Sequence, residues 1–226
     1  MKEKILIIGD THGDISLIQK GITLGVHHEC KRIIQVGDFG FFPKIYPEFI
    51  SSFSSPLPFF FIDGNHDDHS ILPHSSLNIV DVQTLGFSCH NLFYIPRGYL
   101  QRWGESNILF MGGAQSVDKI YRTQGIDWWS NEEINPKDFN TALSYRNLYP
   151  SIDLLITHEC PRTEAINYPG EKQDYSSRAI SELIEVYNPS LLIHGHHHQS
   201  YLIKYKDTII KGLGCNPNDM FELIWI

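Results

Sequence analysis

The sequence predicts an α/β fold with a parallel sheet, because short apolar runs alternate with stretches that suit helices. Three runs in the first hundred residues are almost continuously apolar, at 5–8, 32–36 and 59–62. Such runs are typical of strands that are buried on both faces of a sheet. The stretches Ile15 to Val26 and Pro43 to Phe53 suit helices, the second with proline at its start.

The second half of the chain continues this alternation less regularly. We expect further strands at 92–95, 108–111, 153–157 and 191–194, and helices at 131–148 and 176–187. Near the end, 201–205, 208–211 and 221–225 suit antiparallel strands, and we expect all three to close one edge of a sheet. The length of 226 residues and the absence of a linker favour a single domain, 1–226.

Charge and cysteine content narrow the class of protein. The formal net charge is −8 and no Lys or Arg cluster is longer than a pair, so we expect no strong binding to nucleic acid, which needs a basic face. The four cysteines are far apart and do not suggest a disulfide scaffold. The sequence shows neither a signal peptide nor an apolar run of about 20 residues that would span a bilayer. We therefore expect a cytoplasmic protein without membrane contact.

Four polar motifs follow apolar runs. They are GDTHGD (9–14), GDFG (37–40), GNHDD (64–68) and HGHHH (194–198), and a single histidine, His158, follows a fifth run. In an open α/β sheet, ligands bind beyond the carboxyl ends of the strands. We therefore expect five separate segments to bring Asp, Asn and His side chains to one edge of a sheet.

These residue types suit a pair of divalent metal ions. Two ions about 3.5–4 Å apart activate water and neutralise the charge of a phosphoryl group, and a bridging carboxylate holds such a pair together. A mixed nitrogen and oxygen ligand set suits Mn, Fe, Zn, Co or Ni better than Ca or Mg, and we expect manganese first. The motifs therefore favour a hydrolase of phosphate esters.

Each motif also has an ordinary structural interpretation. Asp10 and Asp38 could be turn or capping residues, and His158 could be a buried histidine with a hydrogen-bond partner. If the segment 194–198 were extended, His194, His196 and His198 would point together and His197 would point away. The joint occurrence of the motifs favours the metal site over these alternatives.

In this order, the motifs resemble those of the calcineurin-like metallophosphoesterase superfamily, over roughly residues 5 to 200. The family pattern is Asp-x-His, Gly-Asp, Gly-Asn-His-Asp/Glu, a single His and Gly-His-x-His. The stretch 112–119, with Arg122 and 128–130, is similar to small bacterial and phage members. With this resemblance, the fold that we expect is a four-layer α/β/β/α sandwich of two mixed sheets flanked by helices.

The resemblance implies a ligand set for each of two ions. One ion would be held by Asp10, His12, Asp38 and His198. The other would be held by Asp38, Asn65, His158 and His196. Asp38 would then be the bridging carboxylate.

The resemblance also implies a mechanism. A hydroxide that bridges the two metal ions would attack phosphorus in line, with no covalent enzyme intermediate. His66 would protonate the leaving oxygen, and Asp67 would orient its ring.

The substrate is less well specified by the sequence. No Arg follows Asp38 closely, as it does in the protein Ser/Thr phosphatases of the superfamily, so a phosphatase of that type is disfavoured. Arg97, Lys119 and Arg122 are candidate phosphate contacts, because a guanidinium matches phosphate oxygens and an ammonium supplies a positive charge. The alternative for each is an ordinary solvated surface residue.

We expect a small-molecule phosphate mono- or diester, such as a nucleotide, as the substrate. The alternatives are a nuclease of the same superfamily and a non-catalytic protein-binding scaffold. The acidic balance weakens the first alternative and the complete ligand set weakens the second.

Overall fold

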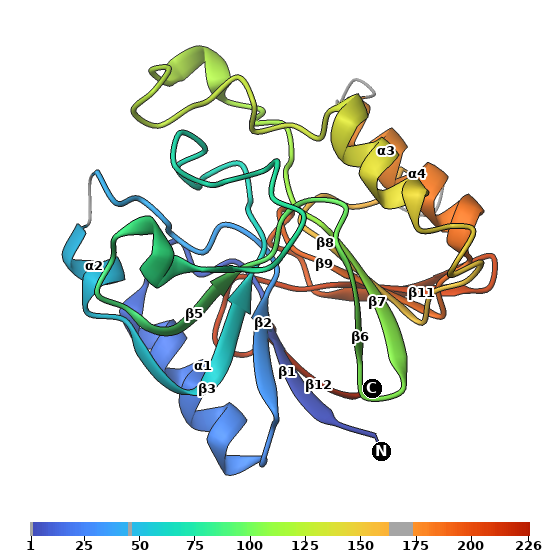
Figure 1. Cartoon of the computed structure of the whole chain (residues 1–226), viewed down its shortest axis with the longest axis horizontal. Helices are drawn as coiled ribbons and strands as arrows, with labels where there is room; N and C mark the ends of the chain where they lie inside the picture. The colour runs from blue at the N-terminus through green and yellow to red at the C-terminus, as the bar shows by residue number, and fades with distance from the viewer. Residues whose placement is uncertain (1, 45–46, 163–173) are drawn as a thin grey trace.

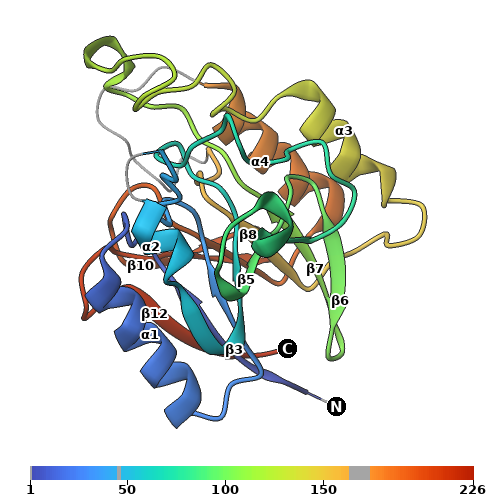
Figure 2. The same cartoon turned by 60° about the vertical axis from the view of Figure 1, so that its left-hand side comes forward.

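Two six-stranded mixed sheets face each other in the computed structural model, which describes residues 2–44, 47–162 and 174–226 (Figure 1). Helices cover the outer face of each sheet, so the layers run α/β/β/α (Figure 2). The fold class predicted from the sequence is therefore confirmed. In the described part of the chain, no helix combines the length and the apolar character needed to cross a membrane.

The first sheet has the order β12-β1-β2-β3-β5-β4. Strands β1, β2, β3 and β5 are parallel, while β12 and β4 pair antiparallel at the edges. Its strands are β1 (Lys4–Ile8), β2 (Arg32–Gln35), β3 (Ser54–Phe61), β4 (Val80–Asp81), β5 (His90–Tyr94) and β12 (Phe221–Trp225). Helices α1 (Ile15–His27) and α2 (Pro47–Ser51) pack on its outer face, and a 3-10 helix, η1 (Val82–Leu85), precedes β5.

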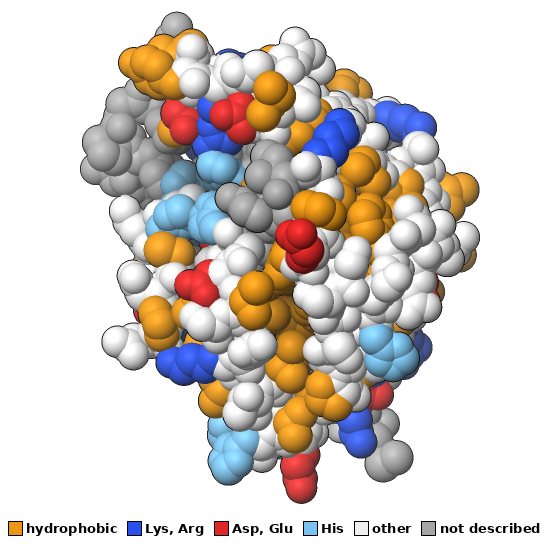
Figure 3. Space-filling model, turned by 90° about the vertical axis from the view of Figure 1, so that its left-hand side faces the viewer, with side chains coloured by type: hydrophobic (Ala, Val, Ile, Leu, Met, Phe, Trp, Pro, Cys, Tyr) orange, Lys and Arg blue, Asp and Glu red, His pale blue; other side chains and the backbone are white. Residues whose placement is uncertain are grey.

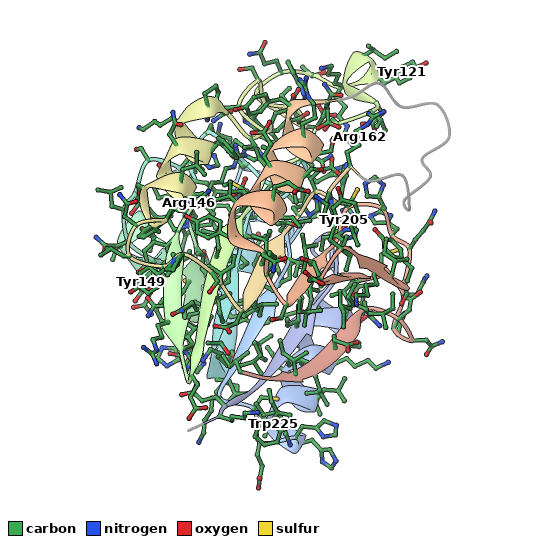
Figure 4. All side chains as sticks on the ribbon, turned by 90° about the vertical axis from the view of Figure 1, so that its right-hand side faces the viewer. Tyr121, Arg146, Tyr149, Arg162, Tyr205 and Trp225 are labelled. Atoms are coloured by element: carbon green, nitrogen blue, oxygen red, sulfur yellow. The ribbon has the colours of Figure 1, made fainter. Side chains whose placement is uncertain are left out.

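The second sheet has the order β10-β11-β9-β8-β7-β6. Its strands are β6 (Leu100–Trp103), β7 (Ser106–Met111), β8 (Leu154–Thr157), β9 (Leu191–His194), β10 (Tyr201–Tyr205) and β11 (Thr208–Gly212). Strands β7, β8, β9 and β11 are parallel. Helices α3 (Pro136–Ser144) and α4 (Tyr175–Tyr187) lie side by side on the outer face of this sheet (Figure 4).

The apolar runs are nearly continuous because both faces of each central strand are buried. In β1, Ile5 and Ile7 point into the core between the sheets, while Leu6 and Ile8 point toward the helix layer. Burial of apolar side chains on both faces stabilises the parallel strands and fixes their register. The sequence pattern therefore predicted the central strands well.

Two predicted helices are shorter than expected at both ends, and a proline explains where each begins. The helix predicted at 43–53 is α2, which begins only at Pro47, because a proline inside a helix removes a hydrogen bond and clashes with the preceding turn. The helix predicted at 131–148 is α3, which begins at Pro136 behind a capping box made by Asn135 and Asp138. Both prolines occupy a helix start, where the missing N–H costs least.

The expectation that three terminal strands close one sheet edge is wrong. Strands β10 and β11 extend the second sheet, whereas β12 pairs antiparallel with β1 in the first sheet. This pairing completes the edge of β1 and places Phe221 against the α1 layer. Figure 4 shows Trp225, in β12, at the opposite end of the molecule from Tyr121.

Other differences are local. Strand β3 begins five residues before the predicted start, and its register with β5 shifts between Ser54 and Phe59, where prolines interrupt the sequence. The short strands β4 and β6 and the 3-10 helix η2 (Lys119–Tyr121) were not predicted. None of these differences moves the strand ends that carry the polar motifs.

Candidate metal centre

Six of the seven predicted metal ligands lie in two groups that share Asp38. The ligating atoms in each group lie within 4.8 Å of one another. The first group is Asp10, His12, Asp38 and His198; the second is Asp38, His158 and His196. The seventh residue, Asn65, joins the second group through a distance of 3.1 Å between its Oδ1 atom and His158 Nε2. The structure thus brings the predicted side chains together. The expectation that they meet at the edge of one sheet is wrong, because they follow β1, β2 and β3 of the first sheet and β8 and β9 of the second.

The first group is open to solvent on its histidine side. Nε2 of His12 lies 3.0 Å from Nε2 of His198, which lies 3.1 Å from Asp10 Oδ2. The two histidine side chains are 34% and 43% exposed, whereas the two carboxylates are 1% exposed. Figure 3 shows histidine side chains gathered on this face, next to acidic and basic side chains. A ligand therefore reaches the centre from the side of His12 and His198.

The second group is buried. His158 is completely buried, and its Nε2 atom lies 3.5 Å from Asp38 Oδ1 while its Nδ1 atom lies 2.9 Å from the carbonyl oxygen of Val36. The ring is therefore fixed at both nitrogens. Burial opposes a charge on His158, but the carboxylates of Asp38 and Asp10 outweigh it and raise the pKa of this imidazole to about 10.

Unusual backbone conformations position four of these side chains. His12, Asp38, His196 and His198 have φ angles of 46°, 54°, 65° and 54°. Residues other than glycine rarely occupy this left-handed region, and such strain is concentrated at functional sites. Close packing adds a second constraint, because a Cβ atom at Gly195 would overlap Asp10 Oδ1. The glycine of HGHHH is therefore required by the approach of a carboxylate.

The donor set fits divalent cations. Asp10 and Asp38 are buried carboxylates, and Asp10 Oδ1 has no hydrogen-bond partner among the described residues. Buried charge and buried unpaired oxygen are costly unless a cation or a donor compensates them. Two carboxylates, four imidazoles and one amide match the ligand preferences of first-row divalent metals.

Glu159 is a site residue that the sequence analysis missed. Its carboxylate lies 2.9 Å from His197 Nε2 and 3.5 Å from His196 Nε2. Burial raises the pKa of Glu159, but His196 and His197 outweigh this effect and bring the pKa down to about 2. A carboxylate behind a ligating histidine fixes the orientation of the ring. In the sequence, only its position directly after His158 could have indicated this role.

His194 does not point with His196 and His198. It is the last residue of β9, it is completely buried, and its Nε2 atom lies 2.5 Å from the hydroxyl oxygen of Tyr201. The predicted alternation fails because the left-handed φ angles of His196 and His198 end the extended conformation after Gly195.

His66 and Arg122 meet beside the centre. Arg122 Nη2 lies 2.7 Å from His66 Nε2 and 2.9 Å from Asp118 Oδ2. The ring centroid of His66 is 5.1 Å from that of His12, and the His66 backbone N–H donates to Asp38 Oδ1. Burial, more than the nearby charges, lowers the pKa of His66. Because a guanidinium can only donate, His66 Nε2 accepts from Arg122, and an imidazole and a guanidinium thus stand next to the first group.

The structure does not support the predicted contact between Asp67 and the His66 ring. The buried Asp67 carboxylate accepts hydrogen bonds from the backbone N–H groups of Gly40, Phe41 and Gly64. These bonds hold the loop after β2 against the loop after β3. Asp67 therefore positions His66 and Asp38 through the backbone.

Arg97 is buried in an ionic network away from the open side of the centre. Its guanidinium contacts Asp63 Oδ2 at 2.6 Å and Asp138 Oδ2 at 3.2 Å, and it is 1% exposed. It also donates to the backbone carbonyls of residues 131, 132 and 133. Its donors are therefore used inside the protein, and the expectation that Arg97 contacts a phosphate is not supported.

A third group of side chains that could bind a metal, Asp63, His69 and His74, belongs to the same ionic network. His69 Nδ1 lies 3.1 Å from His74 Nε2 and 3.3 Å from Arg97 Nη2, so a guanidinium already occupies the place of a cation. Burial lowers the pKa of His69 to about 3 and that of His74 to about 4. These residues form part of the scaffold behind the centre.

Residues 112–135 form a covering segment that lies over the strand ends (Figure 1). It carries Arg122 and also Lys119, whose ammonium is 40% exposed and lies 3.7 Å from Glu133 Oε1. It also carries Ser116 and Glu132. The sequence analysis included Ser116 in the stretch 112–119 but gave neither residue a role, because their contacts are with each other and with Asn65. Ser116 Oγ accepts a hydrogen bond from Asn65 Nδ2 at 3.0 Å.

A four-layer sandwich with Asp, His and Asn side chains gathered at its strand ends is the arrangement of a phosphoester hydrolase. The chain belongs to the calcineurin-like phosphoesterase family, whose model matches residues 3–200. No curated protein sequence matches the chain.

Several solved structures share the fold at low sequence identity. The protein TT1561 of Thermus thermophilus has a TM-score of 0.63 and 15% identity, over 95% of this chain and 90% of that chain. A dimetal phosphatase from Danio rerio has a TM-score of 0.63 and 10% identity, over 99% and 92%. GAP50, the anchor in the inner membrane complex of Plasmodium, has a TM-score of 0.59 and 13% identity, over 94% and 71%.

We predict that Arg97→Met destabilises the protein by about 3–5 kcal/mol, because it leaves the buried carboxylate of Asp63 without its partner. Urea unfolding monitored by circular dichroism would measure the change. Arg102→Met, at an exposed position, is the matched control and should change stability by less than about 0.5 kcal/mol. A loss below about 1 kcal/mol for Arg97→Met would contradict the structural role of the network.

Proposed function

We propose that this chain is a phosphoesterase that works with two divalent metal ions. One would be held by Asp10, His12, Asp38 and His198, and the other by Asp38, Asn65, His158 and His196. The observation that carries this proposal is the position of Asp38, whose two carboxylate oxygens each face a different group of ligands. When bound, such a pair of ions lowers the pKa of water and neutralises charge on a phosphoryl group.

His66 is the proposed general acid. Its ring lies beside the first group of ligands, and its Nε2 atom accepts a hydrogen bond from Arg122 Nη2. This nitrogen can carry a proton for the leaving group once Arg122 turns from it to the phosphate. A proton donor in this position can protonate the leaving oxygen of a phosphate ester while a nucleophile attacks from the metal side. The hydrogen bond from the His66 backbone N–H to Asp38 fixes the position of this proposed acid relative to the metal centre.

Arg122 is the proposed phosphate contact. Its guanidinium is 10% exposed, is oriented by Asp118 and reaches the centre from the covering segment. A guanidinium can bind two phosphoryl oxygens at once, which orients the substrate as well as attracting it. Lys119, in the same segment, is a candidate for a weaker and more exposed contact.

The proposed substrate is a small phosphate mono- or diester, with manganese as the first metal to test. The net charge of −8 argues against a strong hold on a nucleic-acid backbone. The complete ligand set supports catalysis over a purely scaffolding role. Initial rates with Mn²⁺ on a mononucleotide, 2′,3′- and 3′,5′-cyclic nucleotides and bis-nitrophenyl phosphate would define the ester class, and digestion of single-stranded DNA would reveal a nuclease.

We predict that chelation of metal abolishes hydrolysis of bis-nitrophenyl phosphate, because it removes the ions. We expect the same of Asp38→Ala, because both ligand groups lose their shared carboxylate. Released nitrophenolate measures the rate, and metal analysis of the purified variant measures the bound ions. Asp207→Ala, in an exposed turn, is the matched control and should keep full activity. Full turnover in a metal-free sample would contradict the proposed two-metal mechanism.

We predict that His66→Ala keeps both metal ions but lowers kcat by about 10²–10⁴-fold, the usual contribution of a general acid. The loss should be larger for a nucleotide than for a nitrophenyl ester, because nitrophenolate leaves readily without a proton. Steady-state kinetics on both substrates measures this difference. His90→Ala, at an exposed position, is the control; equal losses on the two substrates would argue against proton donation.

We predict that Arg122→Ala lowers kcat/KM by about 10–100-fold, as expected for loss of a charge-assisted hydrogen bond of about 1.5–3 kcal/mol. Arg122→Lys should recover only part of the loss, because an ammonium cannot bind two oxygens at once. Lys119→Ala should have a smaller effect, and Arg102→Ala is the control. An unchanged kcat/KM in Arg122→Ala would remove this residue from the substrate site.

A further inference from the structure

Ser116 connects the covering segment directly to the proposed ligand Asn65. Asn65 Nδ2 donates to Ser116 Oγ at 3.0 Å, and Ser116 Oγ donates to Glu132 Oε2 at 2.9 Å. All three residues are buried, with exposures of 2%, 1% and 1%. Neither Ser116 nor Glu132 belongs to a ligand group or to the motifs that define the family.

The hydrogens along this chain of bonds determine the direction of the Asn65 amide. A serine hydroxyl has one hydrogen, and both Glu132 oxygens accept here, Oε1 from the Ser116 backbone N–H and Oε2 from its hydroxyl. Because Ser116 gives its hydrogen to Glu132, its oxygen can only accept from Asn65. The NH₂ group of Asn65 must therefore face Ser116, since the reversed amide would place two oxygens against each other without a hydrogen between them.

This direction leaves Asn65 Oδ1 facing the second ligand group, 3.1 Å from His158 Nε2. An amide binds a cation only through its oxygen, because its NH₂ group has no free electron pair for a metal. An aspartate in this place would need no such partner, because either oxygen of its carboxylate could bind the ion. A buried partner that selects one amide direction therefore determines whether Asn65 can act as a ligand.

The far end of the chain of bonds is fixed to the scaffold. The Ser116 backbone N–H donates to Glu132 Oε1 at 2.7 Å, so both carboxylate oxygens are held. The carbonyl oxygen of Glu132 accepts from Arg97 Nη2 at 2.8 Å and from the backbone of Ala114 at 3.1 Å. Glu132 therefore has little freedom to turn away from Ser116.

We propose that Ser116 and Glu132 are positioning residues that set the Asn65 amide for the second metal ion and so couple the covering segment to that ion alone. This inference rests on the proposed ligand set. It assigns to Ser116 an effect on one of the two ions, whereas a merely structural role would affect both ions or neither.

Mn²⁺ titration of the chelator-treated full chain, followed by calorimetry, tests the proposal. Ser116→Ala should bind one ion with wild-type affinity and the other about 10–100-fold more weakly, the usual effect of losing a group behind a metal ligand. In electron paramagnetic resonance at low occupancy of the second site, the signal of a coupled pair should give way to that of isolated Mn²⁺. Ser116→Thr, which keeps the hydroxyl, should restore the pair.

Two glutamate variants provide a second test and its control. Glu132→Gln can offer an NH₂ group to Ser116, so the amide direction is no longer enforced and binding of the second ion should weaken. Glu133→Gln, at the neighbouring position outside the chain of bonds, should bind both ions as the wild type does. Wild-type affinity of Ser116→Ala for both ions would overturn the proposal, and so would an equal weakening of both ions. If Ser116→Ala does not fold, the same two outcomes in a folded Glu132→Gln would overturn it.

The proposed function can fail separately from this inference. A wild-type chain that binds fewer than two Mn²⁺ ions would remove the ligand set and the role of Ser116 with it. A wild-type chain that binds two ions but hydrolyses no phosphate ester would contradict the enzymatic proposal, while the effect of Ser116→Ala on the second ion would still support the positioning role.

Discussion

The carboxylate of Asp38 is the group on which the arrangement of the centre depends. It is buried between two groups of ligating side chains, and each of its two oxygens faces one group. A buried carboxylate is stable only when charges and donors compensate it. The imidazoles of His12 and His158 and the backbone N–H of His66 provide this compensation, and they come from three different strand ends.

The concentration of charge around Asp38 requires a rigid support. The bonds from Asp67 to three backbone N–H groups contribute to this support, and the left-handed backbone at four proposed ligand positions adds strain that the support must offset. Behind them, Arg97 ties the end of β3 to the covering segment and to α3 through Asp63 and Asp138. Strained and buried polar groups of this kind persist only where the surrounding fold over-determines them.

The covering segment joins functions that are separate in sequence. Arg122 reaches the proposed general acid, while Ser116 reaches the proposed ligand Asn65. The two contacts anchor a stretch that otherwise has little regular structure, with one short 3-10 helix. The proposed phosphate contact and the proposed second metal ion are therefore linked through one segment.

The sequence by itself predicted the central strands, because continuous apolar runs specify parallel strands buried on both faces. It also indicated which polar side chains follow the strand ends, whereas the proposed ligand set came from the resemblance to the family pattern. That strand ends of two different sheets meet was decided by the tertiary structure. Two helix starts were predicted too early, although the local chemistry of Pro47 and Pro136 as first-turn residues specifies them.

Only the tertiary structure decided which side chains face the centre and which support it. Arg97 has the chemistry of a phosphate contact, but long-range pairing with Asp63 and Asp138 buries it. Glu159, Ser116 and Glu132 act through partners that are distant in sequence or bound through a second side chain, and no local pattern encodes such contacts. The assignment of β12 to the first sheet likewise rests on its long-range antiparallel pairing with β1, which no local pattern encodes.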